Sequence, residues 1–193
     1  MKIELENITK SFGEKHVLRG VSLLLEAGNT AIMGESGSGK TTLLRIISGL
    51  EKADGGIVKA DGTVAFVFAE PRLFENITVL QNVTCVGDGS ADPAKAEKIL
   101  SSLGLKEALM LRPSELSTGM AQRVALARAI YSDRDIFLLD EPLRGLDEET
   151  KNEVIKYLKS SLKGKLAVTV THDRADAEAL CDKIVCLKDG VLN

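Results

Sequence analysis

Short apolar runs alternate with stretches of helical periodicity along most of the chain. The apolar, β-forming runs predict strands, and we expect them at residues 3–8, 17–25, 29–33, 136–139, 166–170 and 183–187. Apolar positions at helical spacing predict helices at 40–48, 147–160 and 174–180. This alternation favours an α/β fold with a largely parallel sheet.

Two turn signals fall among the strands of the N-terminal half. The first, around Gly13, separates the opening strands. The second is Asp61-Gly62, a common turn pair that lies between apolar runs at 57–60 and 63–68. These two runs therefore predict a β-hairpin.

The pattern becomes helical between about residues 73 and 130. Asp92 followed by Pro93 is typical of a helix start, and a second helix is expected at 119–132. We therefore predict a single domain, 1–193, with a catalytic core of about 1–72 and 131–193. The helical subdomain, about 73–130, is inserted between two halves of one sheet.

Composition excludes several classes of protein. The 193 residues carry a net charge of −3, and their Lys and Arg residues are scattered, so we expect no nucleic-acid partner. No secretory signal precedes the first strand and no apolar run reaches the ~18–20 residues that span a bilayer, so we expect no direct membrane insertion. The three cysteines, Cys85, Cys181 and Cys186, lack metal-ligand spacing and are interpreted as buried thiols in a reducing cytosol. His16 belongs to no motif and is expected on the surface.

The segment GESGSGKTT carries the first chemical signal and fits G-x-x-x-x-G-K-[ST] between an expected strand and an expected helix. Its glycines let backbone N–H groups turn inward around phosphate oxygens. Lys40 is expected to reach the β- and γ-phosphates, and the Thr41 hydroxyl to bind Mg²⁺. A glycine-rich linker matches this pattern by chance in roughly one chain in a hundred of this length. The expected nucleotide-binding residues of this loop are Gly34, Glu35, Ser36, Gly37, Ser38, Gly39, Lys40, Thr41 and Thr42.

The segment DIFLLDEP carries the second signal, because an apolar strand delivers two adjacent carboxylates at its carboxyl end. Asp140 is expected to hold Mg²⁺ through its water shell. Glu141, on the other side of the strand, is the candidate general base for an attacking water. A strand that ends in two solvated acids is the alternative, and the presence of the glycine loop favours the catalytic interpretation.

A third segment, ELSTGMAQRVALARA at 115–129, resembles the signature of the ATP-binding-cassette ATPases. With the two motifs above, the resemblance covers essentially the whole chain. SFGEKHVLRGVSL is similar to the aromatic loop, VFAEPRLF to the Q-loop, LRGLD to the D-loop and VTVTHD to the switch strand. The resemblance implies a RecA-like P-loop NTPase core with a mostly parallel sheet, an antiparallel β subdomain and an inserted helical subdomain.

The resemblance also implies roles for residues outside the glycine loop. Phe12 stacks on adenine, and His172 contacts phosphate, although a lone histidine after a strand is more often a solvated loop residue. Ser117 and Gly119, at a helix N-terminus, contact the γ-phosphate of ATP held by a second subunit. Asp147 ends the D-loop. The implied assembly is a head-to-tail dimer, either a homodimer or a heterodimer, with ATP and Mg²⁺ at two composite sites.

Three positions depart from the family pattern. Thr118 replaces a glycine and Met120 a glutamine in the signature, and Ala69 stands where the Q-loop has glutamine. Because a methyl group neither ligates nor donates, we expect ATP hydrolysis to be slow but not abolished. The last expected strand lies close to Asn193, so we expect no C-terminal regulatory domain.

The resemblance indicates an ATPase subunit of a bacterial, importer-type transporter on the cytoplasmic face of the cell membrane. Separate membrane-spanning permease subunits would dock beside residues 69–90, and the sequence does not identify the cargo. Three alternatives stay open: a soluble ATPase of this family that works on nucleic acid or ribosomes, a weakly hydrolysing ATP-gated clamp, and a small-molecule kinase, which leaves the signature unexplained.

Overall fold

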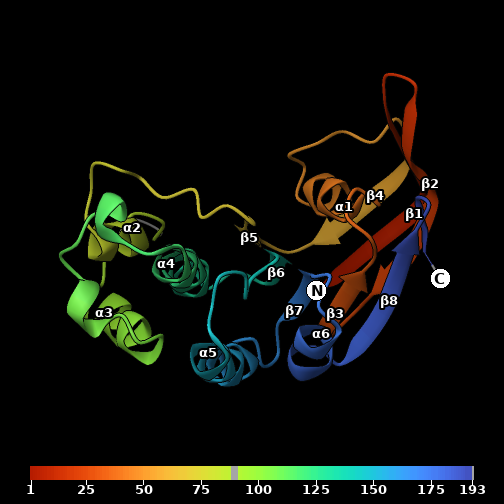
Figure 1. Cartoon of the computed structure of the whole chain (residues 1–193). Coiled ribbons are helices and arrows are strands. Elements are labelled where there is room, and N and C mark those ends of the chain that lie inside the picture. Colours follow the sequence, from red (N-terminus) through yellow and green to blue (C-terminus); the bar gives the residue numbers. More distant parts are fainter. Residues whose placement is uncertain (88–90, 193) are drawn as a thin grey trace. The chain divides into compact units, whose positions relative to one another are not determined.

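The computed structural model describes residues 1–87 and 91–192 (Figure 1). The chain divides into two compact units, each formed from segments that are far apart in the sequence. The first unit contains Met1–Phe66, Asp135–Glu141 and the chain from Leu162 onward. The second contains Val67–Arg134 and Pro142–Ser161, so it includes the segment expected to be helical together with a later helix.

A six-stranded sheet provides the framework of the first unit. Its strand order is β5 (Val64–Val67), β6 (Ile136–Asp140), β7 (Leu166–Val170), β3 (Gly28–Met33), β8 (Lys183–Lys188) and β9 (Val191–Leu192). The pairs β6–β7, β7–β3 and β3–β8 are parallel, and β9 is antiparallel to β8. Every residue of β6 and β7 is buried, as expected for parallel strands that are covered on both faces.

Two helices cover this sheet on opposite faces (Figure 1). Helix α1 (Lys40–Ile47) contacts β6 and β7 and also a strand of the second sheet, whereas α6 (Arg174–Leu180) contacts β3 and β8. The predicted strands and helices of this region are confirmed, with ends shifted by one or two residues in most cases. Because the glycine-rich segment joins the end of β3 to the start of α1, it lies at the carboxyl end of the parallel strands.

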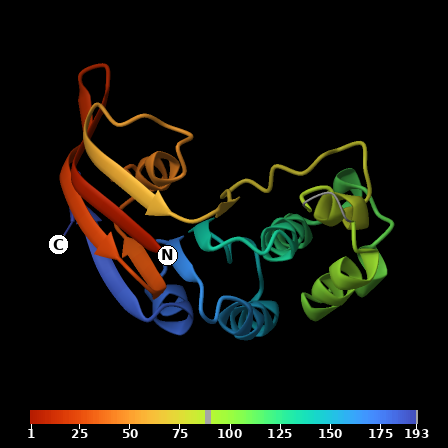
Figure 2. The ribbon, with the colours of Figure 1, turned by 180° about the vertical axis from the view of Figure 1, so that it is seen from behind.

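A three-stranded antiparallel sheet forms the rest of the first unit. Strand β1 (Lys2–Phe12) lies between β2 (Lys15–Leu25) and β4 (Gly55–Asp61) (Figure 2). Gly13, with φ +59°, allows the tight turn that pairs Phe12 with Lys15. Ile3, Leu5 and Ile8 of β1 are buried in the core with α1. Their alternation shifts between Leu5 and Ile8, where the register of the β1–β2 pair also shifts.

The predicted hairpin at Asp61-Gly62 is wrong. Strand β4 pairs with β1, whereas β5 belongs to the other sheet, beside β6. The backbone N–H and the hydroxyl of Thr63 both donate to Asp135 Oδ2 at 2.8 Å, and the Ile136 N–H donates to the Thr63 carbonyl at 2.9 Å. These bonds fix Thr63 beside the start of β6, so that the chain passes from the antiparallel sheet into the six-stranded sheet. The two Thr63 donors also lower the pKa of Asp135.

The second unit is mainly helical. Its helices are α2 (Val79–Thr84), α3 (Pro93–Ser102), α4 (Thr118–Tyr131) and α5 (Glu148–Ser161), with 3₁₀ turns at Lys106–Ala108 and Pro113–Glu115. Helix α4 packs against both α2 and α3. Asp92 caps α3 by accepting a hydrogen bond from the Lys95 N–H at 3.0 Å, and Pro93 takes the first turn, as predicted. Sequence analysis predicted helical character around α2 without defining this short helix.

The fully buried Asn82 organises the chain before and within α2. Its side chain accepts from the Phe74 N–H at 2.8 Å and donates to the carbonyls of Phe74, Ile77 and Thr78. This network fixes an irregular segment against the helix.

The expected burial of the cysteines is wrong, whereas the expected exposure of His16 is confirmed. The cysteines are not buried thiols, because Cys85 and Cys186 are exposed and Cys181 is half-buried. Cys85 and Cys181 lie at the carboxyl ends of short helices, and Cys186 occupies an exposed position of β8. His16 is exposed, as expected. Within residues 1–87 and 91–192, no helix combines the length and the apolar character needed to cross a bilayer.

Candidate nucleotide-binding site

The glycine loop between β3 and α1 leaves no space for larger side chains at two positions. A Cβ atom on Gly34 would lie 2.2 Å from the Leu187 carbonyl oxygen, and one on Gly39 would lie 2.9 Å from Val17 Cγ1. Gly39 is also the N-cap of α1, in the left-handed region with φ +104°, and it offers no side chain to cap the helix. The first N–H groups of α1 are therefore directed toward a space that suits an anion.

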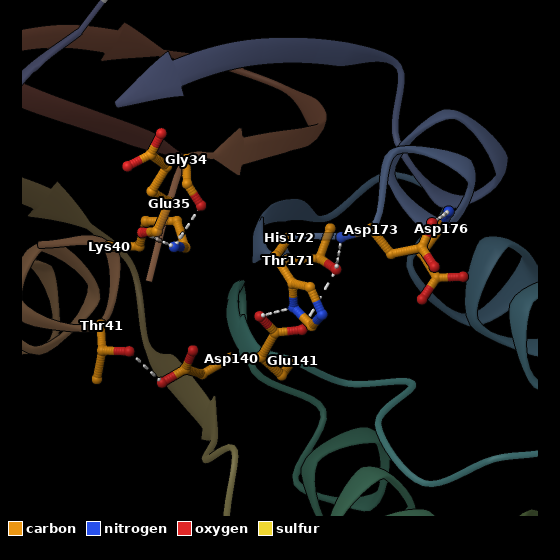
Figure 3. Close-up of polar contacts among 10 residues, drawn as sticks. All are labelled: Gly34, Glu35, Lys40, Thr41, Asp140, Glu141, Thr171, His172, Asp173 and Asp176. Carbon is orange, nitrogen blue, oxygen red and sulfur yellow. Dashed lines mark hydrogen bonds and ion pairs between the residues drawn. The ribbon is translucent and has the colours of Figure 1, made fainter. Parts of the chain in front are cut away.

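Lys40 and Ser38 place polar groups on this loop. Lys40 is only 8% exposed, and its Nζ donates to the carbonyls of Gly34 at 2.7 Å and Glu35 at 2.8 Å (Figure 3). Burial lowers the pKa of Lys40, while the charges of Glu141 and Asp140 act in the opposite direction. Among the described residues, the buried Ser38 Oγ has no hydrogen-bond partner. A buried cation and an unsatisfied hydroxyl beside bare helix amides fit a phosphate group.

Asp140 and Thr41 meet at the carboxyl end of β6. The sheet register aligns Asp140 with Val170 and Val170 with Ile32, so the ends of β6, β7 and β3 lie in one row. The Thr41 hydroxyl donates to Asp140 Oδ2 at 2.9 Å. Asp140 is 3% exposed, and burial raises its pKa, which the Thr41 hydroxyl partly offsets. A carboxylate and a hydroxyl beside a phosphate loop are the oxygen donors that Mg²⁺ prefers, so these residues fit that ion.

Glu141 follows Asp140 in a left-handed backbone conformation, with φ +48°, which is uncommon for a residue other than glycine. Its N–H donates to the Val170 carbonyl at 2.9 Å. Both carboxylate oxygens are held by the segment after β7: His172 Nδ1 lies 2.8 Å from Oε1, and the Thr171 hydroxyl donates to Oε2 at 3.3 Å (Figure 3). Because a carboxylate only accepts, His172 presents a protonated Nδ1 to Glu141.

The loop that carries His172 is itself anchored to α6. The Asp173 carboxylate caps the helix by accepting from the N–H groups of Ala175 at 2.8 Å and Asp176 at 3.2 Å. The Asp173 N–H donates to Thr171 Oγ1 at 3.1 Å. Sequence analysis did not single out Thr171, although a hydroxyl between a buried strand and a candidate catalytic histidine was a usable signal.

Phe12 ends β1 with its side chain 51% exposed. A cavity of about 560 Å³ lies between the glycine loop, the start of β2 and the turn between β8 and β9. Its lining includes Glu35–Ser38 of the loop and Lys15–Val17 of β2, the strand that follows the Gly13 turn. This volume is within the range of small-molecule sites.

Two other predicted motifs lie side by side in the second unit. Ser117 is the N-cap of α4, and its hydroxyl accepts from the Met120 N–H at 3.2 Å. A Cβ atom on Gly119 would lie 2.7 Å from the Gly145 carbonyl oxygen, so position 119 requires glycine. The side chain of Thr118 extends toward Gly145, where an added Cβ would lie 3.3 Å from Thr118 Cγ2. Thr118, which replaces a glycine of the signature, therefore packs against Gly145. This contact could not be predicted from the sequence.

Asp147 caps the start of α5 in the same unit. Its carboxylate accepts from the Thr150 N–H at 3.0 Å and the Thr150 hydroxyl at 2.8 Å, and these bonds lower its pKa. Ser117, Gly119 and Asp147 thus belong to the second unit. The glycine loop, the carboxylates of Asp140 and Glu141, and His172 belong to the first.

A glycine loop between a parallel strand and a helix, with an acidic pair at the end of a nearby strand, defines the fold as that of P-loop NTPases. The profile of the family described as ABC transporter matches residues 18–144, and the chain belongs to this family. The predicted resemblance and fold class are confirmed.

The chain is similar to several import ATP-binding proteins. The sulfate/thiosulfate import ATP-binding protein CysA of Shigella flexneri is 39% identical over 214 residues, which cover 98% of this chain and 58% of CysA. The aliphatic sulfonates import ATP-binding protein SsuB of Rhodopseudomonas palustris (strain BisA53) is 40% identical, over 98% of this chain and 72% of SsuB. The chain therefore spans little more than half of the length of CysA.

A solved structure shares the whole fold. It is the dimeric structure of a post-hydrolysis state of the ATP-binding cassette MJ0796 bound to ADP and Pi. Its TM-score is 0.91 at 32% identity, over 99% of this chain and 96% of that chain.

Proposed function

We propose that this chain binds and hydrolyses ATP as the nucleotide-binding subunit of an importer-type ABC transporter. The observation that carries the proposal is the placement of the Glu141 carboxylate. It is held at both oxygens by Thr171 and His172, at the same sheet edge as the glycine loop. A structural acid at a strand end does not require this arrangement.

Each step of the reaction has a residue suited to it. The N–H groups of the glycine loop and the ammonium group of Lys40 would bind the phosphate oxygens. Glu141 would orient a water molecule and accept its proton while the water oxygen bonds to the γ-phosphorus and the bond to the bridging oxygen breaks, giving ADP and phosphate. Mg²⁺, held by Thr41 and Asp140, would supply positive charge against the phosphate oxygens.

Wild-type protein tests the hydrolysis directly. Phosphate release from MgATP that depends on Glu141 would support an ATPase. ATP binding without such release would favour the ATP-gated clamp, the second candidate, which the alanine at position 69 makes credible. Hydrolysis stimulated by ribosomes or nucleic acid would instead favour a soluble member of the family.

The proposed assembly is a head-to-tail dimer in which Ser117 and Gly119 of one subunit contact ATP bound to the other. The dimeric MJ0796 cassettes support this arrangement, as does the position of Ser117 at the N-terminus of a 14-residue helix. Gly145 lies against Thr118 and Gly119, and Asp147 follows it by two residues in the chain. Asp147 would therefore lie in the same interface. The sequence of a single chain leaves both a homodimer and a heterodimer possible.

Replacement of Ser117 by arginine is expected to abolish the ATP-dependent dimer and leave ATP binding by the monomer unchanged. The long cation would fill the place of the γ-phosphate contact across the interface. Light scattering at saturating ATP, in the Glu141→Gln background, measures the dimer. Ser101→Arg, at an exposed position of α3, is the matched control and should dimerise normally. A normal dimer in Ser117→Arg would contradict the composite site.

Membrane-spanning permease subunits are the proposed partners, and we propose that the protein works at the cytoplasmic face of the membrane. The names of CysA and SsuB, both import ATP-binding proteins, support this proposal. Phe74 is 56% exposed and Met110 is 75% exposed. The residues on either side of Met110 are joined to α2, because their carbonyls accept from the N–H groups of Leu80 and Val79. Contiguous exposed apolar surface is typical of a docking site, and we propose that Phe74 and Met110 contribute to such a surface. Of the expected docking segment, 69–90, the last three residues lie outside the described residues.

Ala69 is the feature that most affects the proposed rate. It is half-buried after β5, and the neighbouring Glu70 is exposed. We expect Ala69→Gln to raise kcat several-fold with little change in ATP affinity. A regained polar contact is worth about 1–3 kcal/mol when fully desolvated, which corresponds to at most ~150-fold in rate. Steady-state phosphate release measures the effect. Glu70→Ala is the control and should change kcat little, whereas a collapse in that variant would show that Glu70 has taken over the role of the glutamine.

A further inference from the structure

Lys10 is the buried cation of the first unit that the proposed reaction does not use. It lies on β1 with only 9% of its surface exposed. Its Nζ lies 2.7 Å from Glu51 Oε1 and 3.3 Å from Asp54 Oδ1, and it donates to the Lys52 carbonyl at 2.7 Å. The same ammonium lies over the ring of Phe12, 5.1 Å from its centroid. Lys10 thus contacts both an anionic segment and an aromatic ring.

The segment 51–54 also fixes the backbone that leads to Phe12. Asp54 Oδ2 accepts from the Ser11 N–H at 2.7 Å, and the Asp54 N–H donates to the Thr9 carbonyl at 2.9 Å. The Lys10 side chain lies on the same face of β1 as Phe12, because residues two apart on a strand share a face. The ring is therefore held from its backbone and from one face.

This anionic segment is joined to the helix that begins at the glycine loop. The Glu51 N–H donates to the Arg45 carbonyl in the last turn of α1, 3.1 Å away. A continuous set of bonds therefore runs from Lys40 at the start of α1, through Glu51 and Lys10, to Phe12. The hydrogen bond to Glu51 raises the pKa of Lys10, and the same bond lowers the pKa of Glu51, so both groups stay charged.

We propose that Lys10 is a positioning residue that holds the Phe12 ring at a fixed place relative to the glycine loop. Because the ammonium takes one face of the ring, the other face is left for the flat base of a nucleotide. The proposal rests on the proposed function, in which Phe12 stacks on adenine. It assigns Lys10 an effect on the base and none on the phosphates. A purely structural ion pair would affect both parts of the ligand equally.

The test compares two ligands on the same protein. Calorimetric titration with MgATP and with magnesium tripolyphosphate separates base contacts from phosphate contacts. Lys10→Met keeps an unbranched side chain that is one atom shorter and removes the charge. We expect this variant to bind MgATP about 5- to 20-fold more weakly, as expected for a partly desolvated cation–aromatic contact, with unchanged affinity for tripolyphosphate. Lys2→Met removes an ion pair to Glu4 at the other end of β1 and should change neither affinity.

Combination with Phe12→Ala shows whether Lys10 acts through the ring. Lys10→Met should cause no further loss of MgATP affinity in a Phe12→Ala protein. Glu51→Gln removes the charge that pairs with Lys10, and it should reproduce the selective loss of MgATP affinity. This variant also provides the test if Lys10→Met fails to fold. Equal losses for both ligands, additive losses with Phe12→Ala, or no loss for MgATP would each overturn the positioning role. Wild-type protein that binds neither ligand would instead refute the proposed function.

Discussion

Replacement of Lys40 by alanine is expected to abolish ATP binding, or nearly so. The lysine is almost fully buried, its ammonium lies among the carbonyls of the glycine loop, and burial already disfavours its charge. A triphosphate would supply the counter-charge that this site lacks. Removal of one partner from a buried, hydrogen-bonded charge pair costs about 2–5 kcal/mol, so the Kd for ATP should rise ~30-fold to more than 1000-fold.

Titration with a fluorescent ATP analogue measures this loss. Lys163→Ala, at an exposed position beyond α5, is the matched control and should bind the analogue normally. The melting temperature of Lys40→Ala must also be measured, because Lys40 bonds to its own loop. Unchanged affinity in a folded variant would remove the glycine loop from the mechanism.

Local signals in the sequence were sufficient wherever a few neighbouring residues decide the conformation. Asp92 caps the helix that it was predicted to cap, and Asp173 caps α6 in the same local way, because the donors lie two or three residues away. The glycine loop was predictable for the same reason: the left-handed backbone of Gly39 is available to glycine without strain. The glycine loop, the proposed phosphate-binding segment, could therefore be predicted from the sequence.

Features set by distant partners could not be predicted in this way. Asp61-Gly62 is a normal turn signal, but Thr63 bonds to Asp135, 72 residues away, and that partner takes β5 into the other sheet. Two of the partners of Lys10, the Lys52 carbonyl and Asp54, lie 42 and 44 residues along the chain. Thr171 reaches Glu141 only because β6 and β7 pair in the observed register. In each case the side chain was visible in the sequence and its role depended on sheet topology.

Glu141→Gln is expected to lower ATP turnover by ~10²-fold or more, the usual range for loss of a general base. The amide has nearly the shape of the carboxylate, so its oxygen can still accept from Thr171. It cannot take a proton from water. Steady-state phosphate release measures the loss, and Glu97→Gln, at an exposed position of α3, is the control that should turn over normally.

The same variant should bind ATP and accumulate as a dimer. Removal of the Glu141 charge takes a negative group away from Lys40, whose pKa it influences, so it should not oppose an anionic ligand. If hydrolysis reopens the dimer, as proposed, a protein that binds ATP and hardly hydrolyses it stays closed. Light scattering at saturating ATP should then report twice the monomer mass for Glu141→Gln. The wild type should return to the monomer as ATP is consumed. A variant that stays monomeric at high protein concentration would contradict the shared site, because Ser117 of one subunit would then have no nucleotide of another to contact.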